Sequence, residues 1–440
     1  MIIGNGPLIT HDEKERFFEK GAVRIVDHLV QNVGDYDQLK KEFPEEEVYD
    51  VEGRLILPGL INCHTHIYSA FARGMAVSKP ARNFPEILEN VWWSLDKKLT
   101  VEDAKKNAYQ TLIESVRNGV TTVFDHHAAP NFIEGSLFAI GEAAREVGIR
   151  ADLCYEVSDR DGEEVTKRGI KENVDFIKAY LNDEEGMLRG HFGIHASFTI
   201  SDRTMEWIKE AMEGVDAGYH IHTAEGIEDQ YDSLEKYGKR VVERLQDWDL
   251  LGEKTLCVHC CNVNNKEMQI LRDTNTAVVH NPESNMNNAV GVTPVISMLK
   301  MGILLGIGTD AYTNDMFESL KVAKVLQSHH LADPTVGFEE SLTLLFKNNP
   351  TIVERFFPHP IGVLKEGAFA DLVVVDYKPY TPFNQQTYGG HLLFGVSGRM
   401  VKDTMVHGKF IMKDRRILTV DEDKIFAESR KRAPEIWKGM

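Results

Sequence analysis

Two histidines separated by a single threonine, His64 and His66, are the first residues in this chain that could bind a metal ion. They directly follow an apolar run that contains Pro58-Gly59. Side chains two positions apart on an extended segment point to the same face of a strand. Two imidazoles held in this way suit a divalent transition metal such as zinc. The pair therefore predicts a metal site at the C-terminal end of an early strand, if the rest of the chain supplies further ligands.

Polar side chains with possible catalytic chemistry also follow most of the other strand-like runs. The chain has 17 histidines. Histidines or carboxylates stand at the ends of successive apolar runs, at Asp125-His126-His127, Glu156, His195, His220, His222, His259, His280 and Asp310. A single histidine of this kind is more often packed in a core than catalytic. A regular series of them favours one shared site.

The elements that must position these residues alternate between β-branched apolar runs and longer amphipathic segments. We expect helices near 101–118, 134–147, 171–180, 202–212, 239–248, 266–272, 294–301 and 317–330. Strands that alternate with helices indicate parallel βαβ units, and eight of them predict a closed (β/α)8 TIM barrel. An open doubly wound sheet is the alternative, but no G-x-G-x-x-G follows a strand. In such barrels, catalytic side chains lie at the C-terminal ends of the strands.

The two ends of the chain differ from its middle because both are rich in short strand-like pieces. Examples are 21–26 and 47–51 near the start, and 371–376 and 404–412 near the end. We therefore expect residues 1–57 and 364–440 to form one small β-sandwich domain from both termini. The barrel then covers residues 58–363.

Charge and composition restrict the classes of partner. The formal net charge is -18 and the isoelectric point about 5.4, which argues against nucleic acid and anionic membranes as partners. Five cysteines in a chain of this size suit reduced thiols better than a disulfide framework. We see no signal peptide and no apolar run of roughly 18 residues that would span a bilayer. A cytoplasmic protein is expected.

Four motifs, taken in chain order, resemble the amidohydrolase superfamily. They are 58–66, 222–225, 280–285 and 308–310, and 362–376 resembles the segment that closes the small β domain in that superfamily. The chain is most similar to the branch of cytosine deaminases and chlorohydrolases. Asp125-His-His-Ala128, together with 92–96 and 284–291, looks like the SsnA group of aminohydrolases. The resemblance covers nearly the whole chain.

The resemblance implies one divalent metal ion, most simply zinc, with iron or manganese as alternatives. Its ligands would be His64, His66, His222 and Asp310. Three imidazoles and one carboxylate leave an open position for a water, whose pKa the metal lowers towards 7. The carboxylated lysine of binuclear relatives has no evident counterpart in this sequence, so a single metal is favoured.

The resemblance also implies catalytic and substrate-binding residues. Asp310 would accept the proton of the water, Glu225 would carry protons to the leaving nitrogen, and His259 would stabilise the attacking hydroxide or the developing oxyanion. His195 matches a position where relatives contact substrate. His127 and Arg160 are further candidate substrate contacts because they follow strand-like runs, although many relatives lack a histidine pair at 126–127.

Some of these positions have alternatives. Adjacent residues on a regular strand point opposite ways, so at most one of His126 and His127 should face the pocket. For Arg160, a solvated loop is the alternative. His220 shares a strand face with His222 and is interpreted as a packed barrel residue rather than a partner of a ligand.

The resemblance implies an aminohydrolase, a hydrolase of carbon–nitrogen bonds other than peptide bonds. It would release ammonia from an amino-substituted nitrogen heterocycle, purine-like or pterin-like. The alternatives are a cyclic amidohydrolase that opens a lactam ring and a binding protein that keeps the fold without catalysis. The expected partners are a small heterocyclic substrate and further copies of the chain in a homo-oligomer.

Overall fold

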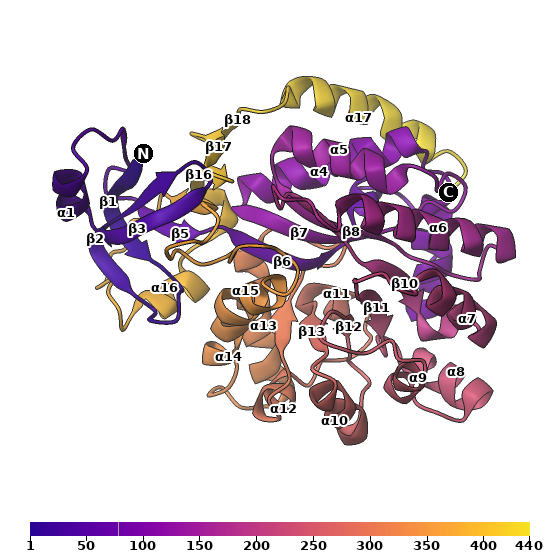
Figure 1. Cartoon of the computed structure of the whole chain (residues 1–440). Coiled ribbons are helices and arrows are strands. Elements are labelled where there is room, and N and C mark those ends of the chain that lie inside the picture. The colour runs from indigo at the N-terminus through magenta and orange to yellow at the C-terminus, as the bar shows by residue number, and fades with distance from the viewer. Residues whose placement is uncertain (78) are drawn as a thin grey trace.

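The computed structural model describes residues 1–77 and 79–440, and a barrel of parallel strands lies at its centre (Figure 1). One sheet has the order β6-β7-β8-β9 and another β10-β11-β12-β13-β14. Parallel bridges between Thr65 and Asp310 and between Val157 and Ile194 join the two sheets at both edges. The strands are β6 (Leu60–Thr65), β7 (Val120–His127), β8 (Arg150–Tyr155), β9 (Leu188–Gly190), β10 (Phe192–Ala196), β11 (Tyr219–Thr223), β12 (Leu256–His259), β13 (Ala277–His280) and β14 (Leu305–Ile307). This arrangement agrees with the predicted TIM-barrel type of fold.

Helices follow these strands and cover the outside of the barrel (Figure 1). They are α4 (Val101–Arg117), α5 (Ser136–Val147), α6 (Glu163–Tyr180), α7 (Asp202–Ala211), α8 (Ile227–Tyr237), α9 (Val241–Asp247), α10 (Asn265–Asp273), α11 (Pro282–Asn287), α12 (Val295–Lys300), α13 (Met316–His330), α14 (Phe338–Thr343) and α15 (Asn349–Val353). Side-chain caps define several starts; Thr100 and Asp103, for example, form a reciprocal capping box at α4.

Several helices differ from the sequence-based expectation. α6 begins at Glu163 rather than near Lys171, and α8, α11, α14, α15 and α17 (Glu422–Ile436) were not predicted. In α8, the apolar residues Ile227, Tyr231 and Leu234 stand at helical spacing but are exposed, and the buried side chains Asp229, Gln230 and Ser233 are polar.

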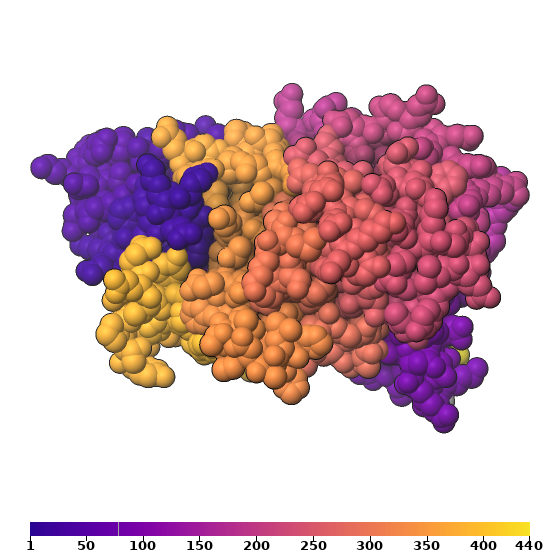
Figure 2. All heavy atoms as spheres, turned by 90° about the horizontal axis from the view of Figure 1, so that it is seen from below, coloured from indigo at the N-terminus to yellow at the C-terminus, as the bar shows by residue number. Residues whose placement is uncertain are grey.

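Strands from both ends of the chain pair in one further sheet. Within the described residues, nine strands contribute: β1 (Ile2–Ile9), β2 (Phe17–Val26), β3 (Leu29–Asp35), β4 (Val48–Asp50), β5 (Leu55–Pro58), β15 (Leu372–Val375), β16 (Val401–Val406), β17 (Lys409–Lys413) and β18 (Arg416–Ile417). β15 pairs antiparallel with β5 and so connects the two ends. Figure 2 shows the N-terminal segment in indigo beside a C-terminal segment in yellow at one end of the molecule.

A long helix near the end of the sequence, α17 (Glu422–Ile436), crosses over the barrel helix α4 (Figure 1). Arg432 Nε donates to Asp103 Oδ1 over 2.7 Å, and the indole N–H of Trp437 donates to the carbonyl of Phe71 over 2.7 Å. The second contact ties this helix to the segment that directly follows β6. In the part of the chain that is described, no helix is long and apolar enough to cross a membrane.

Candidate metal and substrate site

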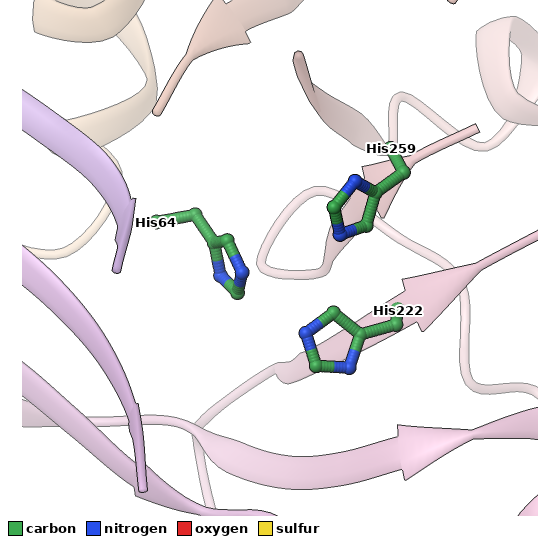
Figure 3. Close-up of side chains that lie close together, drawn as sticks. All are labelled: His64, His222 and His259. Atoms are coloured by element: carbon green, nitrogen blue, oxygen red, sulfur yellow. The ribbon is translucent and has the colours of Figure 1, made fainter. Parts of the chain in front are cut away.

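Three histidines and one aspartate converge at the C-terminal ends of β6, β11 and β14. His66 Nε2 lies 3.1 Å from His222 Nε2 and 3.2 Å from Asp310 Oδ1. His64 Nε2 lies 3.8 Å from the same carboxylate oxygen. In Figure 3, the rings of His64, His222 and a further histidine, His259, gather around one point. The structure thus brings together the four residues expected to be metal ligands.

In His64, His66 and His222, the ring nitrogen that faces away from the cluster, Nδ1, has a hydrogen-bond partner. His66 Nδ1 donates to the carbonyl of His126 over 2.6 Å, and His222 Nδ1 donates to the carbonyl of His195 over 2.8 Å. His64 Nδ1 faces a neighbouring imidazole. With hydrogen on Nδ1, each ring keeps a lone pair on Nε2. These lone pairs point into the cluster.

The cluster fits a divalent cation. Burial is the main cause that lowers the pKa of His64, His66 and His222, so the rings are neutral, as ligands must be. His64 Nε2 is buried and has no hydrogen-bond partner among the described residues. Two lone pairs 3.1 Å apart on His66 and His222 would repel each other. Their spacing suits two ligands that share one ion with metal–nitrogen bonds of about 2.0–2.1 Å.

Asp310 is held as a carboxylate beside the imidazoles. Ser284, on α11, donates its hydroxyl to Oδ2, and the N–H of Ala311 donates to Oδ1 over 2.8 Å. Burial alone would raise the pKa of Asp310, but His66, His259 and the Ser284 hydroxyl lower it below its ordinary value.

Glu225 and His259 complete the polar side of the site. Glu225 Oε2 lies 3.5 Å from His259 Nε2, and the side-chain amide of Asn288 donates to Oε1 over 3.2 Å. Burial, followed by the charge of Asp310, raises the pKa of Glu225 well above its ordinary value. His259 Nδ1 donates to Asn285 Oδ1 over 2.7 Å, which fixes the ring orientation.

The backbone is strained at three of these strand ends. Ala224, His259 and Asp310 have φ angles of +48°, +69° and +54°. Residues with a side chain rarely adopt this left-handed conformation, and such strain concentrates at functional sites. Here it turns the chain sharply just where side chains must reach the centre of the barrel mouth.

A narrow pocket of about 40 Å³ opens onto the cluster. Aromatic and aliphatic side chains form most of its walls, namely Tyr68, Phe84, Leu88, Trp92, Trp93 and Phe198. Glu156, His195, Asn288 and Glu225 supply polar groups. His195 Nδ1 pairs with Thr199 Oγ1 over 2.9 Å, so the Nε2 edge of the ring is the one available to a ligand.

A second cavity of about 780 Å³ adjoins the same cluster. It shares His66, Trp92, Asp310 and Ala311 with the narrow pocket. Its other walls come from α4, from the segment after β14 and from α17. The site therefore combines a tight aromatic pocket with a wider neighbouring space.

Two of the expected substrate contacts, His127 and Arg160, do not line the narrow pocket. His127 is fully buried, and its ring lies near the rings of Tyr68 and Tyr155. Of the two adjacent histidines, His126 is the one that packs against the cluster, with its ring centroid 4.6 Å from that of His222.

Arg160 lies behind the pocket wall. It pairs with Asp96, its guanidinium is 5.1 Å from the ring centre of Trp93, and its Nη2 is 3.8 Å from Glu156 Oε1.

Sequence reasoning assigned no role to several residues that reach the site. Tyr68 and Asn288 line the pocket. No motif marks Tyr68, and Asn288 lies within the motif 284–291 but was given no role. Glu156 was noted as a carboxylate that directly follows a strand. That position in the sequence was the signal that could have indicated its place in the pocket wall. His220 was interpreted as packed, yet its Nε2 lies 2.9 Å from His64 Nδ1.

The sequence is similar to a known protein family and to proteins named as deaminases. The model of the "Amidohydrolase family" matches residues 55–411. A 5'-deoxyadenosine deaminase of Methanosarcina mazei is 30% identical, with 99% of this chain and 98% of the relative covered. A 5-methylthioadenosine/S-adenosylhomocysteine deaminase of Bacillus cytotoxicus is 31% identical, with 96% of each covered.

Solved structures are similar over the same extent. An adenosine deaminase from Xanthomonas campestris with bound zinc superposes with a TM-score of 0.88 at 22% identity, covering 99% of this chain and 98% of that one. Guanine deaminase of E. coli gives a TM-score of 0.80 at 19% identity, covering 94% and 99%. Because both identities are below 25%, the structural similarity establishes the fold and no more.

Proposed function

Because the chain belongs to the amidohydrolase family, we propose that it is a zinc-dependent aminohydrolase that deaminates a purine nucleoside or a related aminopurine. The observation that carries the proposal is the convergence of three imidazoles and Asp310 beside the buried Glu225. The relatives named as deaminases of 5'-deoxyadenosine and of 5-methylthioadenosine and S-adenosylhomocysteine support a purine substrate.

In this proposal, His64, His66, His222 and Asp310 hold the metal ion. A bound divalent cation would supply a water nucleophile that ionises near neutral pH. Asp310 would also accept a proton from the attacking water. Water and the amino heterocycle are consumed, and the oxo heterocycle and ammonia are released.

Glu225 supplies the proton that the leaving nitrogen needs, since an amide anion is a poor leaving group. Its raised pKa keeps a proton available. His259 Nε2 faces both Glu225 and Asp310, at 3.5 and 3.7 Å. Because Nδ1–H is committed to Asn285, His259 stabilises developing negative charge between them when the ring takes up a second proton.

The aromatic walls suit a flat heterocycle, and the wider cavity suits the sugar and its 5' substituent. Phe84, Leu88, Trp92 and Trp93 roof the narrow pocket. They come from α2 (Phe84–Ile87), η2 (Leu88–Trp92) and α3 (Trp93–Asp96).

His195 and Glu156 are the proposed substrate contacts from the pocket wall. Arg160 supports Glu156 from behind, and His127 supports the wall through Tyr68.

We further propose that residues 1–57 and 364–440 act as a composite β-sandwich domain beside the barrel of 58–363. The antiparallel pairing of β5 with β15 supports this division. A cytoplasmic location and a homo-oligomer remain part of the proposal. The free state of all five cysteines supports the location.

The test is metal analysis of the purified protein followed by a panel read by ammonia release. The panel contains 5'-deoxyadenosine, 5-methylthioadenosine, adenosine, adenine, guanine and pterin. We expect bound zinc, and ammonia from an adenine nucleoside with the matching oxopurine as product. Ring opening of an oxopurine without ammonia would replace this proposal with a cyclic amidohydrolase. A protein that binds zinc but converts no member of the panel would contradict the substrate class.

A further inference from the structure

The three histidines of the cluster are held in different ways. His66 and His222 donate Nδ1–H to backbone carbonyls, which no side-chain substitution removes. His64 Nδ1 instead faces Nε2 of His220 at 2.9 Å. Both rings are fully buried. The tautomer of His64 therefore depends on one side chain.

Hydrogen bonds beyond His220 determine the direction of this contact. Cys154 Sγ lies 3.3 Å from the carbonyl of Asp125, to which it donates its S–H, and 3.7 Å from His220 Nδ1. With the thiol hydrogen directed to the Asp125 carbonyl, the sulfur accepts from His220 Nδ1–H. A neutral His220 then has a lone pair on Nε2, and His64 must donate its Nδ1–H to it.

The reverse direction would disable the cluster. If His220 donated from Nε2, His64 would have to carry its hydrogen on Nε2, the atom that faces Asp310 and His66. His220 Nδ1 would then oppose the sulfur of Cys154 without a hydrogen between them. The observed contacts select the direction that leaves His64 Nε2 as a lone pair.

We propose that His220 is a positioning residue that fixes the tautomer and ring orientation of His64 as a metal ligand, with Cys154 fixing His220 in turn. Partners that accept from the second nitrogen of a ligand histidine commonly strengthen metal binding. His220 does not touch the reacting atoms and acts through His64. The inference rests on the proposed ligand set.

The test compares three substitutions at His220. His220→Gln keeps an acceptor at about the distance of Nε2, His220→Met has the same length without an acceptor, and His220→Asn is polar but too short to reach His64. His280→Met is the matched control. His280 is also a fully buried barrel histidine, and its Nδ1 pairs with Thr293 Oγ1 rather than with the cluster.

The readout is the rate of zinc loss from loaded protein to an excess of a chromophoric chelator, together with the unfolding midpoint of each metal-free protein. We expect the Met and Asn variants to lose zinc about 10–100 times faster than the parent. We expect the Gln variant to stay near the parental rate. The His280 variant should lose stability without faster zinc loss.

Equal rates of zinc loss in the Gln and Asn variants would overturn the proposal, because the reach of the acceptor would then be irrelevant. So would a Met variant that holds zinc as the parent does. A parent that binds zinc but deaminates nothing would contradict the proposed substrate and leave this comparison valid. A parent that binds no zinc would overturn the ligand set and this inference with it.

Discussion

At the scale of single residues, two neighbouring carboxyl groups are pushed towards opposite protonation states. Burial and then the charge of Asp310 raise the pKa of Glu225, whereas His66, His259 and Ser284 outweigh burial and lower that of Asp310. Pairs whose environments separate their pKa values in this way often serve as acid and base. The separation supports a proton donor at Glu225 and an acceptor at Asp310.

Replacing Glu225 by Gln keeps the shape and the contact from Asn288 but removes the acid. We expect kcat to fall by about 10²–10⁴, the usual contribution of a general acid, with zinc content unchanged. Ammonia release and elemental analysis measure the two quantities. Glu228→Gln, three residues further along at the start of α8, is the control and should stay near the parental rate. Near-parental turnover in Glu225→Gln would exclude Glu225 as the donor.

Asp310→Asn should abolish turnover and weaken zinc binding while the protein stays folded. The amide cannot accept the proton of the water, and it is a poorer ligand than a carboxylate. Turnover, zinc content and the unfolding midpoint are measured on the same preparation. A variant with a near-normal rate would refute the role of Asp310 as base.

The candidate catalytic residues were accessible to sequence reasoning because they occur in short strings directly after strands. The sequence did not decide between His126 and His127. β7 pairs with β8 in regular register from Thr122 to His127, but all its residues are buried. A strand that is buried on both faces has no alternation of apolar and polar residues to mark which side chains point inwards.

At the scale of elements, apolar periodicity revealed most of the barrel but not the parts with polar contacts. α8 buries polar side chains, and α17 covers α4 partly through Arg432 and Asp103. The junction between the barrel and the terminal sheet is also polar. Arg150 at the start of β8 and Asp371 before β15 are fully buried, with Nη2 3.0 Å from Oδ2. Because Arg150 and Asp371 are 221 positions apart, no local sequence pattern indicates that they pair.

Asp371→Asn tests this junction, since it leaves the buried guanidinium of Arg150 without its counter-charge. Breaking a buried pair from one side costs about 3–5 kcal/mol, so we expect the free energy of unfolding to fall by roughly that amount. Denaturant unfolding measures it. Asp37→Asn is the control, because its pair with Lys20 is exposed and exposed pairs contribute little to stability. Equal effects of the two substitutions would show that the junction does not depend on this pair.

At the scale of the whole molecule, the wide cavity beside the cluster exists because the chain returns to the barrel after the terminal sheet. α17 and the residue that follows it supply Phe426, Ala433 and Trp437 to its wall, together with residues of α4 and of the segments after β6 and β14. If the substrate occupies this cavity, its size is limited by a segment more than 100 positions away from the last candidate ligand, Asp310. No motif near the ligands predicts this.

Ala433→Phe should narrow the wide cavity without touching the cluster. If the sugar and its 5' substituent occupy this space, kcat/KM for an adenine nucleoside falls about tenfold or more, as expected when a pocket rejects added bulk. Any activity towards the free base should change little, because the base lies in the aromatic pocket. Ala427→Phe, on the exposed side of the same helix, is the matched control and should leave both values unchanged. Equal losses for nucleoside and base in Ala433→Phe would place the sugar elsewhere.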